Sequence, residues 1–447
     1  MMRASGRVTS RKPSATLADL GKSVAQHTGL ALRVYLAASA LMAPLARRHL
    51  KKRLARGKEE PARWREKLGE ASVPRPEGVL VWMHAVGVGE LLALPGLVNR
   101  IRALRPDVTV LLTSSSRTSA EAIARNLPAG AIHQYLPLDA LPFVRAFLDH
   151  WRPDLSVWAE RDVWPAFIWE IARRDVPLAI VNGKMSAASF RQKARARALF
   201  SDLYTRFAFI GAQEEESARH FAAFGGEPSR IHVTGSLKSA APPLADQPES
   251  RHGVENDLVG HRVWLAASTH PGDEGAVIEA HQRLLQRDPG AVLIVAPRAP
   301  ERAPEVVATC RTAGLAAELL PPDNRLPARA EVYVVQRIGQ LGLWYRVADT
   351  AFVGGSIAAV GGHNPYEAAR LDCAILHGPN VWNFEDDYDV FDRAGAARLT
   401  LHAEAVAEAL SDPATLAMRP RAAALAERGE AQLDRTARDL LAMLAVR

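Results

Sequence analysis

The sequence predicts an α/β protein made of two doubly wound domains of similar size. At 447 residues the chain is too long for one ordinary core, and two domains of about 150–200 residues each are expected. From residue 79 onward, short apolar runs alternate with helical stretches, as repeated strand–helix units require. These runs are apolar throughout, which is typical of parallel strands that helices cover on both faces.

The predicted strands form two series. The first comprises residues 79–84, 108–113, 155–160, 177–182, 207–212 and 231–236, and the second comprises 263–268, 291–296, 331–336, 350–355 and 373–378. Residues 238–261 contain prolines and several charges, which interrupts the pattern and predicts a linker. The predicted organisation is an N-terminal region (1–58), a first domain (59–238), a linker (239–262) and a second domain (263–447) that ends in helices.

Cysteine content and net charge narrow the classes of partner. Cys310 and Cys373 are the only cysteines, so neither a disulfide framework nor a thiolate metal cluster is expected, and a reducing compartment fits. A net charge of +7 suits partners that carry phosphate, either nucleic acid or an anionic membrane. Because zinc-finger spacing and aromatic RNA-binding motifs are missing, nucleic acid is the weaker interpretation.

The N-terminal region favours the membrane. Residues 29–46 are apolar except for Arg33, and seven Lys or Arg follow within the twelve residues 47–58. An apolar stretch of this length is at the short limit for spanning a bilayer. A helix that lies on a membrane, with the basic run against anionic lipid, fits the pattern better. The alternative is a buried helix followed by a solvated basic one.

The stretch LVWMHAVGVGELLALP (80–95) resembles the start of a dinucleotide-binding fingerprint but does not complete it. Leu92 occupies the place of the third glycine, and Glu90 would put a carboxylate where a pyrophosphate must sit. Glu90 is left at the carboxyl end of a strand, where ligands bind in such sheets. Two interpretations stay open, a functional carboxylate and one that only complements the helix dipole.

A stronger signal lies in GGSIAAVGGHNPYEAA (354–369), a strand end followed by a glycine-rich loop and a helix start. Asn364 suits the N-cap, Pro365 the first helical position, and Glu367 the third position of a capping box. Exposed backbone N–H groups and the helix dipole would form a seat for phosphate. Glu367 either caps the helix or accepts ribose hydroxyls. A cap needs neither the paired glycines nor His363, so a nucleotide site is favoured.

Two further junctions carry candidate ligand-binding groups. STHPGDE (268–274) places small hydroxyl residues before acids at a strand–helix junction, and PRAPER (297–302) presents Arg298 and Arg302 after the next strand. These arginines could hold a phosphate or a sugar carboxylate with two hydrogen bonds. For each arginine taken alone, a surface salt bridge is the alternative.

Together these segments resemble a known family. WMHAVGVGE (82–90), WAERDVWP (158–165), NGKMS (182–186), STHPGDE, PRAPER, GGSIAAVGGHNPYEAA and GPNVWNFED (378–386) are similar, in order and spacing, to the 3-deoxy-D-manno-octulosonic acid (Kdo) transferases of lipopolysaccharide synthesis. The resemblance covers residues 30–445. It implies a GT-B fold, two Rossmann-like domains that face a cleft. It also implies CMP-Kdo as donor and the lipid A precursor lipid IVA as acceptor, at the cytoplasmic side of the inner membrane, with no cofactor and no metal.

The resemblance also implies roles for individual residues. Glu90 matches the general base, and Glu160 matches a second glutamate of the family's cleft. The positions on the donor side are Ser268, Thr269, Arg298, Gly361, Gly362, His363, Asn364, Glu367 and Asn383. The positions on the acceptor side are His84, Lys184 and Ser186.

Several residues depart from the family's usual pattern. Gly87 replaces a serine and Lys184 replaces an arginine, which keeps the charge but loses bidentate geometry. The remaining departures are Arg161-Asp162-Val163, Ser236, Ala299, Gln336 and Gln340, of which the two glutamines have lost a carboxylate. Two alternatives therefore stay open: a GT-B enzyme of other donor or acceptor specificity, and a non-catalytic lipid A-binding relative.

Overall fold

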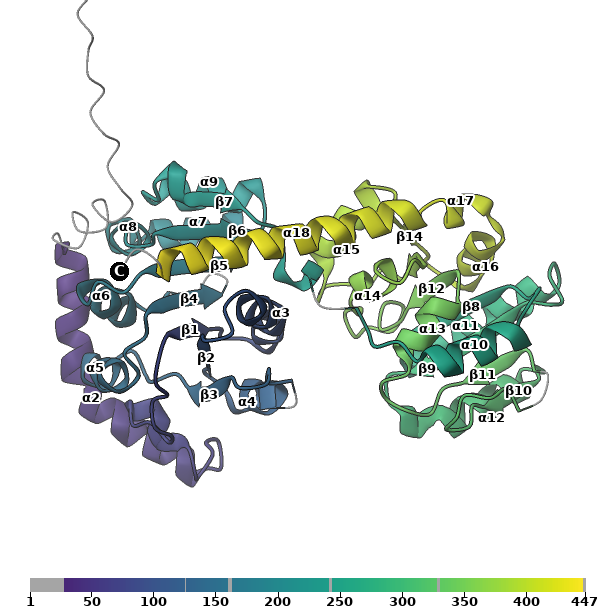
Figure 1. Ribbon diagram of the computed structural model, residues 1–447, viewed down its shortest axis with the longest axis horizontal. Coiled ribbons are helices and arrows are strands. Elements are labelled where there is room, and N and C mark those ends of the chain that lie inside the picture. Colours follow the sequence, from purple (N-terminus) through teal and green to yellow (C-terminus); the bar gives the residue numbers. More distant parts are fainter. Residues whose placement is uncertain (1–27, 125, 160–162, 241–242, 328–329, 445–447) are drawn as a thin grey trace, which may run out of the picture. The chain divides into compact units, whose positions relative to one another are not determined.

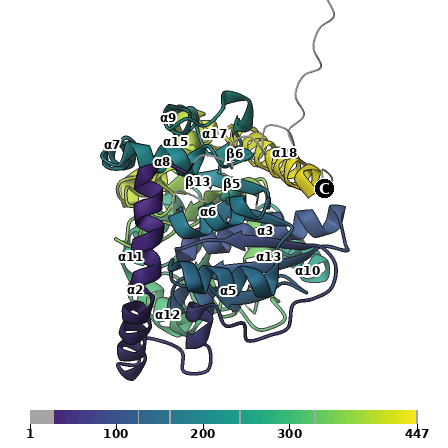
Figure 2. The same ribbon diagram turned by 90° about the vertical axis from the view of Figure 1, so that its left-hand side faces the viewer.

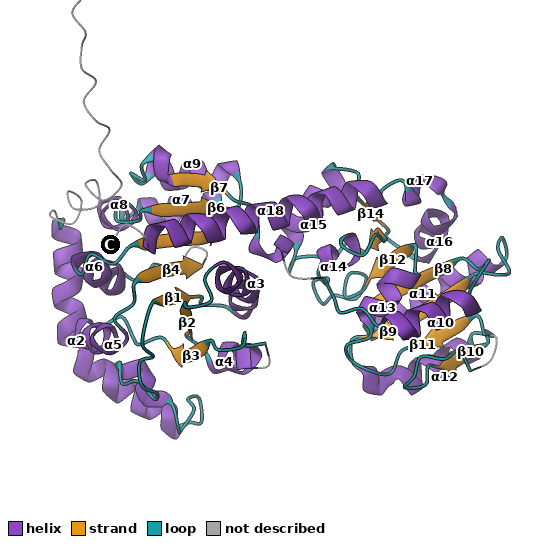
Figure 3. Cartoon of the chain, in the orientation of Figure 1, coloured by secondary structure: helices purple, strands orange, loops and turns teal. Residues whose placement is uncertain are grey.

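The computed structural model describes residues 28–124, 126–159, 163–240, 243–327 and 330–444 of the chain, which folds into two compact units (Figure 1). Unit 1 comprises Met1–Leu237 and Leu433–Arg447, and unit 2 comprises Lys238–Gln432. Each unit is an α/β fold around one seven-stranded sheet, whose strands are orange in Figure 3. The predicted fold class is confirmed.

The sheet of unit 1 is parallel, in the order β3-β2-β1-β4-β5-β6-β7. Its strands are β1 (Leu80–His84), β2 (Thr109–Ser114), β3 (Ile132–Tyr135), β4 (Leu155–Ala159), β5 (Leu178–Gly183), β6 (Phe209–Ala212) and β7 (Ile231–Val233). The strand order reverses between β1 and β4, which is the switch point at which doubly wound sheets bind ligands.

Helices cover both faces of this sheet. They are α3 (Val88–Leu104), α4 (Arg117–Ala124), α5 (Leu141–Trp151), α6 (Pro165–Arg173), α7 (Ala187–Ala194), α8 (Arg197–Tyr204) and α9 (Glu215–Ala223), with the short 3₁₀ turns η1 (Trp64–Leu68) and η2 (Pro228–Arg230). Aromatic rings fill the core on one face: the Trp82 centroid lies 4.8 Å from that of Phe147 and 5.5 Å from that of Trp158. Tilted and T-shaped ring contacts of this kind add to the free energy that apolar burial supplies.

Unit 2 repeats the plan with the parallel order β10-β11-β9-β8-β12-β13-β14. Its strands are β8 (Val263–Thr269), β9 (Val292–Pro297), β10 (Ala317–Leu319), β11 (Val332–Val334), β12 (Thr350–Val353), β13 (Ala374–His377) and β14 (Ala397–Leu399). Its helices are η3 (Leu237–Ala240), α10 (Pro248–Asp257), α11 (Pro271–Leu285), η4 (Pro300–Arg302), α12 (Ala303–Thr312), α13 (Leu341–Val347), α14 (Pro365–Ala369), α15 (Glu385–Arg393), α16 (Ala403–Ser411), α17 (Pro413–Leu416) and α18 (Arg419–Leu444). The switch point lies between β8 and β12.

The apolar and basic N-terminal segments form one continuous helix, α2 (Leu30–Ala55), which packs on α5, α6 and α8 (Figure 2). Leu32 and Leu36 are buried against unit 1. The Tyr35 hydroxyl donates a hydrogen bond of 2.7 Å to the Asp139 carboxylate, so a polar contact also holds the helix in place. α2 is therefore docked along one face on the protein, with its other face exposed.

The structure differs from the predicted elements mainly at the sheet edges. Strands β3, β10 and β14 were not predicted, because edge strands of three or four residues lack a long apolar run. The predicted linker contains helix α10. Pro248 was expected to interrupt regular structure, but it occupies the first turn of this helix, where proline is tolerated. The last helix α18 begins in unit 2, but its residues from Leu433 onward belong to unit 1.

Candidate functional site

Several of the predicted site residues lie at the switch points of the two sheets. In unit 1, β1 leads into the turn before Glu90. In unit 2, β8 ends at Thr269, and the glycine-rich loop follows the neighbouring strand β12. Because parallel strands present their carboxyl ends at one edge, each unit brings its candidate residues together there.

Glu90 is the third residue of α3, and its carboxylate folds back over the turn. Gly87 is the N-cap, with φ −84° and ψ 166°, a conformation open to any residue. A Cβ atom on Gly87 would nevertheless lie 1.9 Å from the Glu90 Oε2 atom. The missing side chain at position 87 thus provides the space that the half-buried carboxylate occupies.

His84, predicted to contact the acceptor, lies in the interior of unit 1 with 1% of its surface exposed. Its Nδ1 atom is 2.9 Å from the Thr113 hydroxyl oxygen. Burial lowers the pKa of His84 to about 3, so the ring is neutral at physiological pH. Its Nε2 atom is buried and has no hydrogen-bond partner within the described residues.

The other predicted residues of unit 1 follow β4 and β5. Ser186 is exposed and caps α7, accepting a hydrogen bond of 3.3 Å from the Ser189 N–H. Lys184 is half-buried directly after β5. Glu160, together with Arg161 and Asp162, lies outside the described residues.

In unit 2, the start of α14 confirms only part of the predicted cap. Asn364 is the N-cap and accepts a hydrogen bond of 3.1 Å from the Tyr366 N–H, and Pro365 opens the helix. The prediction of a capping box is wrong. Within the described residues the Glu367 carboxylate makes no hydrogen bond, so it does not accept one from the Asn364 N–H. Burial raises the pKa of Glu367, and the positive charges of Arg298 and Arg370 act in the opposite direction. Because no hydrogen bond within the described residues uses its oxygens, the Glu367 side chain keeps its capacity to accept hydroxyl groups.

The backbone N–H groups of the glycine-rich loop are bonded to the Asp273 carboxylate and to a carbonyl of the loop itself. The Asp273 carboxylate accepts hydrogen bonds from the N–H groups of Gly355 (2.7 Å), Ile357 (3.0 Å) and Ala358 (2.8 Å). The Gly355 carbonyl accepts two more, from Gly361 at 3.1 Å and from Gly362 at 2.8 Å. These five N–H groups are unavailable to a phosphate, so the prediction of a cradle made of exposed loop N–H groups is wrong for them.

Side chains supply the polar groups beside this loop. The His270 and His363 rings stack with centroids 5.3 Å apart, and their Nε2 atoms are 3.0 Å apart. Only one hydrogen fits between the two nitrogens, so one ring donates and the other accepts. Burial, with the nearby charges of Arg298 and His270, lowers the pKa of His363 to about 4.

The two predicted arginines have different roles. The Arg302 guanidinium donates hydrogen bonds to both carboxylate oxygens of Glu274, at 2.8 and 2.9 Å. Arg302 therefore forms a salt bridge, as the alternative interpretation predicted. Arg298 is exposed, and its backbone N–H donates to the Thr269 carbonyl at 2.9 Å. Within the described chain its guanidinium has no hydrogen bond or ion pair, which leaves a positive charge for a ligand.

Asn383 connects the loop after β13 with the glycine-rich loop through hydrogen bonds. The Asn383 side-chain amide donates to the Val360 carbonyl at 3.0 Å, and the Asn383 backbone N–H donates to the Gly361 carbonyl at 2.9 Å. Gly361 has a φ of +104°, and a Cβ atom there would lie 2.5 Å from the Asn383 Nδ2 atom. Only glycine fits this position.

The end of β8 is equally constrained. Ser268 is buried with a φ of +55°, and Thr269 is buried beside it. Sequence reasoning missed His270 and Asp273, which follow directly. A signal was present, because an N-cap residue, a proline and an acid three positions after the cap mark a helix start.

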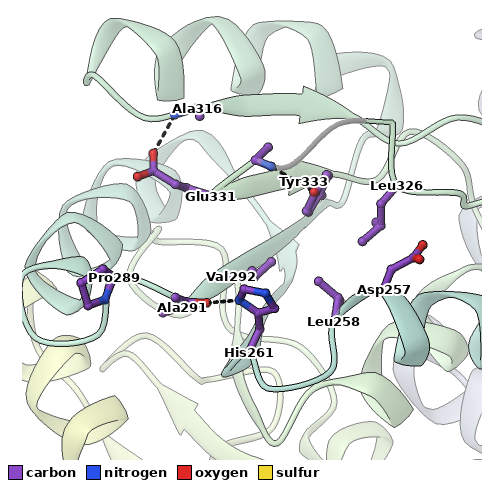
Figure 4. Close-up of a pocket in the computed structure, with 12 residues that line it drawn as sticks. Asp257, Leu258, His261, Pro289, Ala291, Val292, Ala316, Leu326, Glu331 and Tyr333 are labelled. Carbon is purple, nitrogen blue, oxygen red and sulfur yellow. Dashed lines mark hydrogen bonds between the residues drawn. The ribbon is translucent and has the colours of Figure 1, made fainter.

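A separate cavity lies at the opposite end of the unit 2 sheet (Figure 4). Its volume is about 520 Å³, and His261, Val292 and Tyr333 are among its lining residues. The His261 ring donates to the Gly290 carbonyl at 2.7 Å, and Glu331 accepts from the Ala316 N–H at 2.8 Å. This cavity contains none of the predicted site residues. Among the described residues no group of three His, Cys, Asp or Glu could hold a metal ion.

Comparison with known proteins identifies the family. Residues 62–241 match the family model described as 3-deoxy-D-manno-octulosonic-acid transferase. A relative from Arabidopsis thaliana, described as a "probable 3-deoxy-D-manno-octulosonic acid transferase, mitochondrial", is 31% identical over 403 residues, 87% of this chain and 90% of the relative. A 3-deoxy-D-manno-octulosonic acid transferase of Rickettsia bellii is 32% identical over 351 residues, 78% of this chain and 83% of that protein.

A likeness to solved structures concerns the fold alone. The UDP-GlcNAc 2-epimerase of Neisseria meningitidis, bound to UDP-GlcNAc, has a TM-score of 0.50 at 10% identity and covers 81% of this chain and 100% of its own. The relatives, by contrast, share sequence along most of their length. The chain belongs to the 3-deoxy-D-manno-octulosonic acid (Kdo) transferase family.

Proposed function

We propose that this glycosyltransferase moves Kdo from CMP-Kdo to the lipid A precursor lipid IVA during lipopolysaccharide synthesis. One observation carries the proposal: Arg298, His363 and Glu367 surround the switch point of unit 2, while Glu90 lies at the switch point of unit 1. Membership of the Kdo transferase family supplies the transferred sugar.

The residues of unit 2 suit a nucleotide sugar. Arg298 carries a positive charge for the phosphate of CMP, whose negative charge increases as the glycosidic bond breaks. Glu367 has a carboxylate that can accept two ribose hydroxyls. Charge and hydrogen bonds placed in this way stabilise the departing CMP without a metal ion.

Glu90 acts as the general base in this proposal. The acceptor hydroxyl loses its proton to the carboxylate, its oxygen forms a bond to the anomeric carbon of Kdo, and the bond from that carbon to the CMP phosphate oxygen breaks. CMP leaves with the electron pair, and the anomeric configuration is inverted. General bases of this kind contribute typically about 10²- to 10⁴-fold to the rate.

Helix α2 suits attachment to the cytoplasmic side of the inner membrane. By length and composition it could cross a bilayer, with a mean hydropathy of 1.3 over 18 residues. Its packing on three helices and the hydrogen bond from Tyr35 to Asp139 favour a helix that stays docked on unit 1.

The exposed face of α2 carries an apolar stripe. The exposed side chains at helical spacing are Leu30, Val34, Leu41 and Leu45. Exposed Arg48 and Lys52 continue this stripe.

We therefore propose that α2 lies along the membrane surface. Its apolar stripe would enter the boundary between headgroups and acyl chains, and its basic end would contact anionic headgroups. A glycolipid acceptor in the same leaflet would then lie near unit 1.

The departures at Gln336 and Gln340 have a structural explanation. Gln340 is buried, and its amide donates to the Asn324 side-chain oxygen at 2.7 Å. The Gln336 amide donates to the Leu320 carbonyl. A carboxylate could donate neither hydrogen bond, so both glutamines hold residues 320–324 in place. Because this structural role explains the two glutamines, they give less support to a different donor specificity.

Glu90→Gln tests the proposal. Purified protein, lipid IVA and CMP-Kdo generated in situ should yield a heavier glycolipid by mass spectrometry. The variant should lose at least about 10²-fold in rate. Its affinity for CMP, measured by calorimetry, should stay that of the wild type, because Glu90 belongs to unit 1.

Three outcomes would contradict the proposal. A Glu90→Gln variant that transfers at the wild-type rate removes Glu90 as base, and full complementation of a deletion strain by it would favour a non-catalytic binding role. Preference for UMP or GMP over CMP in a thermal-shift series would favour another donor, since ligand at 100 times its Kd adds about 2.7 kcal/mol of stability.

A further inference from the structure

We infer that Asp273 is the positioning residue of the donor site, holding the glycine-rich loop and the His270–His363 pair in one arrangement. The inference rests on the proposed function, in which this part of unit 2 binds CMP-Kdo. The residue does not touch the ligand itself, because 0% of its surface is exposed.

The Asp273 carboxylate accepts hydrogen bonds from four backbone N–H groups, two at each oxygen. Oδ1 accepts from Ile357 at 3.0 Å and Ala358 at 2.8 Å. Oδ2 accepts from Gly355 at 2.7 Å and His270 at 2.9 Å. Within the described residues the carboxylate forms no ion pair with Lys or Arg, so these N–H groups are what offsets the cost of its burial.

Two of the four bonded residues, Gly355 and His270, lead to groups at the ligand-binding side. Gly355, whose N–H is bonded to Asp273, uses its carbonyl to hold Gly361 and Gly362. His270 is the N-cap of α11, and its ring pairs with His363 at 3.0 Å. One carboxylate therefore connects the end of β8 with the loop after β12, on both sides of the switch point.

Close packing leaves this arrangement little freedom. A Cβ atom on Gly272 would lie 3.0 Å from the Ala358 Cβ, and one on Gly354 would lie 2.8 Å from the Thr269 Cα. The two loops thus touch backbone to backbone around the carboxylate. Losing bonds to Asp273 should shift the glycine-rich loop and the histidine pair rather than be absorbed elsewhere.

Asp273→Asn is a sharp test because the amide keeps the shape of the side chain. An NH₂ group in place of either oxygen meets two N–H donors and loses both bonds. The variant should weaken CMP binding by about tenfold or more, as the loss of two charge-assisted hydrogen bonds predicts. The KM for CMP-Kdo should rise, while the KM for lipid IVA stays unchanged.

Asp139→Asn provides the matched control. Asp139 also accepts backbone N–H groups at the start of a helix, from Ala166 and Phe167 at 3.1 Å each, and it belongs to unit 1. This variant should lose stability without changing the affinity for CMP. If Asp273→Asn proves unfolded by circular dichroism, His270→Ala replaces it, because it removes the ring that pairs with His363 and leaves the carboxylate in place.

The outcomes separate this inference from the proposed function. Wild-type protein that neither binds CMP nor transfers Kdo overturns the proposed function. Wild-type protein that does both, with a folded Asp273→Asn variant of equal CMP affinity, overturns the positioning role. The same holds if Asp139→Asn weakens CMP binding as much, or if His270→Ala binds CMP like the wild type.

Discussion

At the scale of single residues, Gly87 leaves open the space into which the Glu90 carboxylate folds back. The N-cap conformation would accept any residue, so adding a side chain at position 87 does not strain the backbone. A Cβ atom would displace the carboxylate, which lies 1.9 Å from that position.

We expect Gly87→Ala to lower the turnover number for Kdo transfer by roughly 10- to 100-fold, because a small displacement of a catalytic group has effects of this size. Steady-state kinetics with CMP-Kdo and lipid IVA would measure it, with CMP affinity by calorimetry as the control. An unchanged turnover number would show that the folded-back carboxylate is not the active arrangement.

A second residue, His84, makes the stability of unit 1 depend on pH. Its pKa falls from the ordinary 6.5 to about 3 in the folded protein. The unfolded chain therefore binds more protons below pH 6.5, and the free energy of unfolding decreases as pH falls from 6.5 towards 3. Above pH 6.5 this contribution is constant.

Between pH 6.5 and pH 5 the loss from His84 alone should be about 2 kcal/mol. Urea unfolding at pH 7 and at pH 5, with amide exchange used to monitor unit 1, would measure this loss of unfolding free energy. His84→Gln should reduce the difference between the two pH values by this amount. An equal difference in both proteins would show that other groups of unit 1, such as His133, dominate.

At the scale of elements, α2 combines a buried face with an exposed apolar one. Leu36 is 7% exposed and packs in the core of unit 1, whereas Leu41 is 80% exposed. Leu41→Glu should therefore change the free energy of unfolding by less than about 0.5 kcal/mol. It should weaken binding to anionic vesicles, because the exposed stripe then carries a negative charge.

Sedimentation with phosphatidylglycerol-containing vesicles would measure this binding. Leu401→Glu is the matched control, since Leu401 is 60% exposed on unit 2 outside α2. Equal vesicle binding by all three proteins would exclude the stripe as the membrane-contacting surface. High salt should weaken wild-type binding in part, through the basic end of the helix.

The elements also show how far local sequence patterns extend. The start of α14 was predictable because Asn364 and Pro365 act on their immediate neighbours. The bonds of the glycine-rich loop were not, because Gly355 and Asp273 are 82 positions apart. Edge strands such as β10 escaped prediction since three residues contain too little periodicity.

At the scale of the whole molecule, the end of α18 completes unit 1. Ala437 and Leu440 are buried there, and Asp434 forms an ion pair with Arg100 of α3, the helix that carries Glu90. Unit 1 thus depends on residues that follow unit 2 in the chain.

Leu440→Ala should lower the free energy of unfolding of unit 1 by about 2–5 kcal/mol, the usual cost of a cavity at a fully buried leucine. Amides of β1 and β4 should exchange faster, while those of β8 and β12 keep their protection, as mass spectrometry of hydrogen exchange would show. Leu416→Ala, at a partly exposed leucine of unit 2, should change neither set. Faster exchange in both units would mean that they unfold together.

The sequence by itself determined the two parallel sheets, the loops that carry the candidate residues and the family resemblance. These features depend on apolar periodicity and on residues within a few positions of each other. Only the tertiary structure decided that Glu90 folds over Gly87, that Asp273 occupies loop N–H groups expected to bind phosphate, and that α2 is docked on one face. Burial and hydrogen-bond partners depend on segments far apart in the chain, whose approach no local pattern encodes.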